Sequence, residues 1–237
     1  MRRMFFLAGA VLAASAFAVL ACNAVLGIDS ATLLADAGSA TNYAVSCTNY
    51  CSLLSTVCVP STAAGDNTEY LNNTVCATMC PYFDAGPAVL QPSVDPTPAD
   101  TLSCRIWHAN AAILSGDPHT HCAHAGPLGG GVCDDNGDAC LAFCRLDLDI
   151  CTGDAAAYTG LDDCLSACHP DGGYVGFPYE LKPTDVEVSD LTFHAGNTLN
   201  CRIYHLENFV ATGDPVHCTH TSAGGGGVCD DPAASDP

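Results

Sequence analysis

Residues 104–135 read CRIWHANAAILSGDPHTHCAHAGPLGGGVCDD, and residues 201–231 read CRIYHLENFVATGDPVHCTHTSAGGGGVCDD. Both stretches have an arginine after the first cysteine, then three histidines in register, then a glycine run before VCDD. Self-similarity of this kind predicts that a structural module occurs twice in the chain.

The cysteines extend the similarity upstream of these stretches. The chain has 17 cysteines, and apart from Cys22 they divide equally between residues 47–135 and 140–231. The two segments differ in length only between their matching cysteines, where loops tolerate insertion. We therefore expect a mostly α, small disulfide-rich fold: two tandem repeats of a three-helix cysteine-stapled domain with Gly-rich irregular tails.

Helical spacing and capping residues predict where the helices lie. In the first domain we expect a helix over 47–58, a second capped within Asp66–Thr68 and ended by Pro81, and a third capped by Asp100 or Thr101 and ended at Gly116. In the second domain, Asn197 or Thr198 should cap the third helix and Gly213 should end it.

The N-terminus is typical of a processing segment. Arg2 and Arg3 precede an uncharged apolar run, which ends in the tetrad VLAC at residues 19–22. This tetrad resembles a bacterial lipobox. The resemblance implies a signal peptide over 1–21, a lipidated Cys22 followed by a flexible tether to residue 46, and, through Asn23, an outer-membrane location on the periplasmic or cell-surface side. An uncleaved anchor helix and an ordinary secretory signal are the alternatives.

The charge limits the classes of partner. After cleavage before Cys22, 26 acidic residues would face 4 basic ones, a formal charge of −22. Nucleic acid is excluded as a partner because no basic patch can displace its counterions. Attachment to a membrane should therefore depend on the N-terminal lipid, and an envelope or extracellular protein remains a possible partner.

An exported chain this rich in cysteine is expected to form disulfides. The CxxxC pairs resemble those of α-hairpinin peptides and of twin CX3C or CX9C helix-hairpin proteins, which covers about a third of each domain. The resemblance implies the bridges Cys47–Cys80, Cys51–Cys76, Cys140–Cys168 and Cys144–Cys164. The remaining bridges would then be Cys58–Cys104 and Cys122–Cys133, with Cys151–Cys201 and Cys218–Cys229 in the second domain.

The chain as a whole resembles the cysteine-rich lipoproteins of myxobacteria, a group without an established activity. The resemblance therefore implies a location more than a function. It leaves a non-enzymatic structural or binding module of the cell envelope as the leading interpretation. No GxSxG, P-loop, dinucleotide or HExxH motif points to an enzyme.

The recurring histidines are the main alternative lead. Three neutral imidazoles with an open position suit zinc or copper, and carboxylates at Asp134/Asp135 or Asp230/Asp231 are candidates to orient them. Structural histidines in the core or at turns explain the same pattern. The candidate ligands are His108, His121 and His124 in the first domain and His205, His217 and His220 in the second.

Three further patterns have two interpretations each. Arg105 and Arg202 are either an anion clamp or internal forks to a carboxylate such as Asp134. The run from Cys164 to His169 resembles a stretched c-type haem motif, but a disulfide explains its cysteines in both repeats. The acidic linker 134–138 lacks the alternation of a calcium loop, so a turn is favoured.

Overall fold

The computed structural model describes residues 43–58, 69–87, 89–90, 99–134, 138–169, 176–178 and 194–230. The expected signal peptide 1–21, Cys22 and most of the tether lie outside these ranges. Residues 42–237 form one compact unit by their contacts, and the division into two domains stays a prediction. Within the described residues, no helix is long and apolar enough to cross a membrane.

The described chain is mostly helical and disulfide-rich, as predicted, with one short antiparallel pairing between β1 (Tyr43–Ala44) and β2 (Val89–Leu90). The elements of residues 47–134, called the first half below, are α3 (Cys47–Val57), α4 (Asn73–Met79), η1 (Cys80–Tyr82), α5 (Leu102–Ser115), α6 (Pro118–Ala125) and η2 (Gly129–Gly131). Those of residues 138–230, the second half, are α7 (Ala139–Ile150), η3 (Gly153–Ala155), α8 (Leu161–Cys168), α9 (Leu199–Thr212), α10 (Val216–Thr221) and η5 (Gly225–Gly227).

The helix ends follow their capping residues. The Thr101 hydroxyl accepts from Cys104 N at the start of α5, and Gly116 ends that helix with a φ of 68°. Thr198 caps α9 in the same way. The second helix differs from the prediction. α4 begins after Asn72, whose side chain accepts from the backbone N–H groups of Thr74 and Val75. The predicted capping residues Asp66–Thr68 lie outside the described residues.

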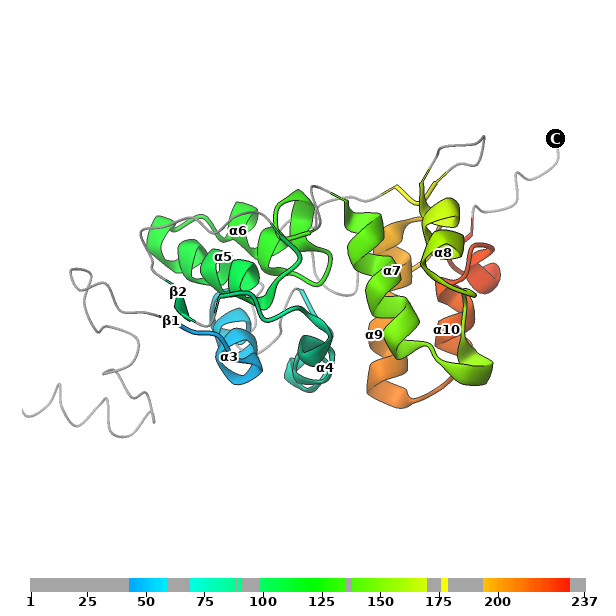
Figure 1. Ribbon diagram of the computed structural model, residues 1–237, viewed down its shortest axis with the longest axis horizontal. Coiled ribbons are helices and arrows are strands. Elements are labelled where there is room, and N and C mark those ends of the chain that lie inside the picture. Colours follow the sequence, from blue (N-terminus) through cyan, green and yellow to red (C-terminus); the bar gives the residue numbers. More distant parts are fainter. Residues whose placement is uncertain are drawn as a thin grey trace, which may run out of the picture. The chain divides into compact units, whose positions relative to one another are not determined.

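In its described residues, each half contains one helix more than predicted, because a short helix occupies the segment expected to be an irregular tail. Asp117 caps α6 through Thr120 N, and Pro118 stands at the first helical position, where a missing N–H costs nothing. α6 packs against α5, and α10 packs against α9 (Figure 1). The glycine run after each short helix forms a 3-10 turn, η2 or η5.

The disulfides agree with the hairpin resemblance and correct the other pairings. Four bridges join facing helices as expected: Cys47–Cys80, Cys51–Cys76, Cys140–Cys168 and Cys144–Cys164. The predicted pairs Cys58–Cys104, Cys122–Cys133, Cys151–Cys201 and Cys218–Cys229 are wrong. The bridges are instead Cys58–Cys122, Cys104–Cys133, Cys151–Cys218 and Cys201–Cys229.

The extra helix explains this correction. A flexible tail would allow Cys122 and Cys133 to close a loop on themselves. Because residues 118–125 are helical, Cys122 is fixed on the inner face of α6 and meets Cys58 at the end of α3. The glycine turn then carries Cys133 back to Cys104 near the start of α5.

Buried tyrosines connect the hairpin to the extra helix. Tyr50 on α3 donates its hydroxyl to Ala125 O at 2.6 Å, and the Tyr70 hydroxyl lies 2.9 Å away. In the second half, the Tyr158 hydroxyl donates to Thr221 O at 2.7 Å. Each short helix is therefore attached at its C-terminal end to the hairpin core as well as by its disulfide.

Candidate metal centre

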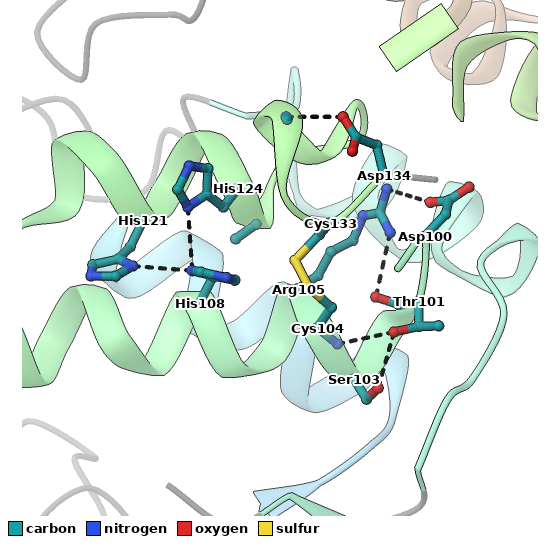
Figure 2. Close-up of a disulfide and its surroundings, with 12 residues drawn as sticks. Asp100, Thr101, Ser103, Cys104, Arg105, His108, His121, His124, Cys133 and Asp134 are labelled. Atoms are coloured by element: carbon teal, nitrogen blue, oxygen red, sulfur yellow. Dashed lines mark hydrogen bonds and ion pairs between the residues drawn. A yellow bond between two sulfur atoms is a disulfide. The ribbon is translucent and has the colours of Figure 1, made fainter. Parts of the chain in front are cut away.

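Three histidines meet between α5 and α6 in the first half. His108 lies on α5 and is buried, whereas His121 and His124 lie three residues apart on one face of α6 and are partly exposed. His108 Nδ1 is 3.1 Å from His121 Nδ1 and 3.4 Å from His124 Nδ1. Figure 2 shows both α6 rings directed toward the ring of His108.

The same arrangement occurs between α9 and α10. His205 on α9 is buried, and His217 and His220 on α10 are partly exposed. His205 Nδ1 is 3.0 Å from His217 Nδ1 and 3.1 Å from His220 Nδ1. The six histidines singled out from the sequence therefore converge as two triads.

Hydrogen bonding alone does not account for three converging Nδ1 atoms. A neutral imidazole nitrogen carries either one hydrogen or one in-plane lone pair. His108 Nδ1 can therefore make one well-directed hydrogen bond, but it faces two histidine nitrogens. A cation placed between the rings would accept a lone pair from every Nδ1.

The spacing fits such a cation. Two nitrogens bound to one tetrahedral zinc ion at the usual bond length lie roughly 3.3 Å apart. The distances from the Nδ1 atom of each central histidine to its two neighbours run from 3.0 to 3.4 Å. In each triad all three ligand nitrogens lie within 4.8 Å of one another. Three histidines leave a fourth position open.

Burial keeps the central histidines neutral, which a metal ligand requires. Burial above all, together with the neighbouring His124 and His121, lowers the pKa of His108 to about 3. In the second triad, burial lowers the pKa of His205 to about 4, although a hydrogen bond to the His194 carbonyl opposes the shift. Burial also lowers the pKa of His220.

Arg105 positions α6 opposite His108. It is buried one turn before His108 and donates from Nε to Gly126 O at 3.1 Å and from Nη2 to Pro127 O at 3.0 Å, both just beyond the end of α6. It also pairs with Asp100 at 2.7 Å and lies 4.0 Å from the Phe83 ring centroid. The internal-fork interpretation therefore fits, with Asp100 in place of the expected Asp134 (Figure 2).

Arg202 repeats this role in the second half. It donates to Ser222 O and Ala223 O, each at 3.3 Å, beyond the end of α10, and it lies 3.4 Å from the Phe177 ring centroid. Both guanidinium groups donate to carbonyl oxygens of their own half. The two arginines therefore hold the ends of α6 and α10 in place.

The glycine runs pass close behind the histidine helices. A Cβ at Gly130 would lie 2.7 Å from the Ala123 carbonyl, and one at Gly226 would lie 2.8 Å from the His220 ring. Asp134, one of the expected orienting carboxylates, instead accepts from Gly131 N at 2.9 Å. Asp135 and Asp231 lie outside the described residues.

Other cysteine and histidine groups in the described chain have structural partners. Cys164 and Cys168 are both in disulfides, which leaves no thiol for haem attachment. His169 Nε2 pairs with Asp138 Oδ2 at 3.1 Å. The disulfides Cys104–Cys133 and Cys201–Cys229 lie beside the central histidines of the two triads.

Two neighbours of the triads were not singled out from the sequence. Trp107 lies edge-on to His108, with ring centroids 4.8 Å apart, and Tyr204 lies in the same way against His205 at 5.2 Å. The sequence signal for these two neighbours is that an aromatic residue directly precedes the first histidine in both repeats. His194, which stacks on Tyr204, has no counterpart in the pattern.

Comparison with known proteins finds a family match over the first half of the chain. Residues 30–136 are similar to the BfoA family C-terminal domain. The matched segment contains the whole first triad and all four disulfides of the first half. No curated protein and no solved structure matches the chain.

Proposed function

We propose that this protein binds transition-metal ions, one in each three-histidine triad. The observation that carries the proposal is the convergence of three Nδ1 atoms at metal-ligand spacing, twice, on helices separately fixed by disulfides. This proposal takes up the metal-binding alternative from the sequence in place of the leading interpretation, a structural or binding module. The protein then acts as a metal-binding component of the cell envelope rather than as an enzyme.

The donor set favours divalent zinc or copper. Imidazole nitrogen suits both ions, whereas cuprous copper prefers thiolate and thioether sulfur. The eight disulfides of the described chain use all sixteen cysteines that follow Cys22, so they offer no thiolate. An oxidised exported chain with histidine ligands is consistent with a divalent ion.

Elemental analysis tests the proposal. The full chain, exported and purified oxidised in detergent, should contain or take up about two zinc or copper ions per molecule, one for each triad. The double variant His108→Ala, His205→Ala should retain none above background, because each triad loses its central ligand.

The matched control is His169→Ala, which removes a histidine paired with Asp138 outside both triads. It should keep both metal ions. Free-thiol counts and helical circular dichroism should be unchanged in all variants, which separates metal loss from misfolding. A folded wild-type protein that takes up neither zinc nor copper would show that the triads are structural.

A further inference from the structure

The two triads differ at the nitrogen that does not face the cluster. In the second triad, His205 Nε2 lies 3.3 Å from the carbonyl oxygen of His194. In the first, His108 Nε2 is buried and has no hydrogen-bond partner in the described part of the chain. His108 and His205 are otherwise alike: both are buried, they lie on the matching helices α5 and α9, and each has a disulfide beside it.

This difference matters when a metal binds. Coordination through Nδ1 forces the remaining ring hydrogen onto Nε2. At His205 that N–H donates to the His194 carbonyl, which fixes the tautomer and makes the ligand nitrogen more basic. At His108 the same hydrogen would occupy a buried position without an acceptor among the described residues, so loading the first triad carries an extra free-energy cost.

Tyr204 contacts the residue that supplies this carbonyl, His194. The His194 and Tyr204 rings stack with centroids 3.8 Å apart and planes 17° apart. Two residues after His194, Gly196 N donates to Val228 O at 3.0 Å. In the first half, Trp107 stands at the position that matches Tyr204. Within the described residues, the aromatic rings that Trp107 contacts are those of His108 and His121.

We propose that the two triads are unequal, and that the His205 triad binds a divalent transition metal first and more tightly than the His108 triad. The proposal rests on the metal binding proposed above. Tyr204 is then a positioning residue that acts through His194 rather than a ligand. The chain would hold one firmly bound and one more readily exchanged ion.

Zinc titration of the metal-free full chain, in competition with a chromophoric chelator, tests this order. The wild type should bind in two steps whose dissociation constants differ by about tenfold or more, the usual effect of a ligand's hydrogen-bond partner. His205→Ala should remove the tighter step and leave the weaker one. His108→Ala should do the reverse.

The variant Tyr204→Ala tests whether the contact with His194 causes the difference in affinity. It should raise the dissociation constant of the tight step by about tenfold without removing it, whereas Tyr204→Phe, which keeps the stack, should leave it unchanged. Trp107→Ala is the matched variant in the first half and should not alter the tight step.

Two indistinguishable sites, or a tight step that is lost in His108→Ala, would overturn the inference and leave the proposed function standing. Absence of zinc binding by a folded wild-type chain would remove both. A Tyr204→Ala chain with normal disulfides and an unchanged tight step would contradict the role given to His194.

Discussion

Asp147 occupies a core position that is apolar in the first half. It follows Cys140 by seven residues, as Leu54 follows Cys47, and both side chains are fully buried. Burial raises the pKa of Asp147 to about 6, and the nearby Thr221 hydroxyl, which donates to Cys218 O, opposes the shift. Folding therefore favours the protonated carboxyl.

The sign of the pH dependence follows. The folded pKa exceeds the unfolded value of about 3.9. The contribution of Asp147 to stability is therefore fully present below about pH 4 and is lost as the pH rises through about 6. Between about pH 4 and pH 7, oxidised wild type should lose about 2 kcal/mol of unfolding free energy relative to Asp147→Asn. Guanidinium unfolding of both proteins at both pH values measures this difference.

Comparison at equal pH cancels the titration of the histidines, which both proteins share. Asp149→Asn, on the exposed face of the same helix, is the control and should change stability by less than about 0.5 kcal/mol. A difference between wild type and Asp147→Asn that stays constant from about pH 4 to pH 7 would show that Asp147 is charged in the folded protein.

At the scale of the element, α6 depends on its attachments. A helix of eight residues is not stable alone in water, and the Cys58–Cys122 bridge holds it between its two histidines. The double variant Cys58→Ser, Cys122→Ser should raise the zinc dissociation constant of the first triad by about tenfold or more, because its two α6 ligands lose their fixed position. It should leave the second triad unchanged.

The double variant Cys47→Ser, Cys80→Ser is the matched control. It removes a bridge of the helical hairpin that contacts neither triad, so stability should fall by about 2–4 kcal/mol while both zinc steps remain. Equal losses of zinc affinity in the two double variants would mean that general destabilisation, not the position of α6, is responsible.

Local patterns predicted the longer helices well, and the resemblance to helical-hairpin proteins supplied the hairpin bridges. Thr101 and Gly116 bound α5 because capping depends on neighbouring residues alone. α6 was missed although Asp117-Pro118 is a helix-start signal, because its eight residues lack an apolar stripe. The wrong bridges at Cys122 and Cys218 follow from that omission.

The candidate ligands were predictable as residues but not as a geometry. Three histidines recurring in register identified the triads, since ligands must be repeated for a site to be repeated. The contact between His205 Nε2 and the His194 carbonyl was not predictable, because a backbone oxygen leaves no mark in the sequence. The carbonyl partners of Arg105 were not predictable for the same reason, because they depend on where α6 ends.

At the scale of the whole molecule, the disulfides and the N-terminus suggest the same compartment. Sixteen cysteines in eight bridges require an oxidising environment. The VLAC tetrad at residues 19–22 would deliver the chain there and attach it through Cys22. We therefore propose a lipid-anchored envelope protein.

Cell fractionation tests the anchor. Wild type should stay in the membrane fraction in high salt and leave it in detergent, because a chain of formal charge −22 can be held by acyl chains but not by anionic headgroups. Cys22→Ser should incorporate no labelled fatty acid, while its disulfides and its two zinc steps remain. If the wild type carries no fatty acid and its mass still includes residues 1–21, the apolar run itself is the anchor, and the lipobox interpretation is wrong.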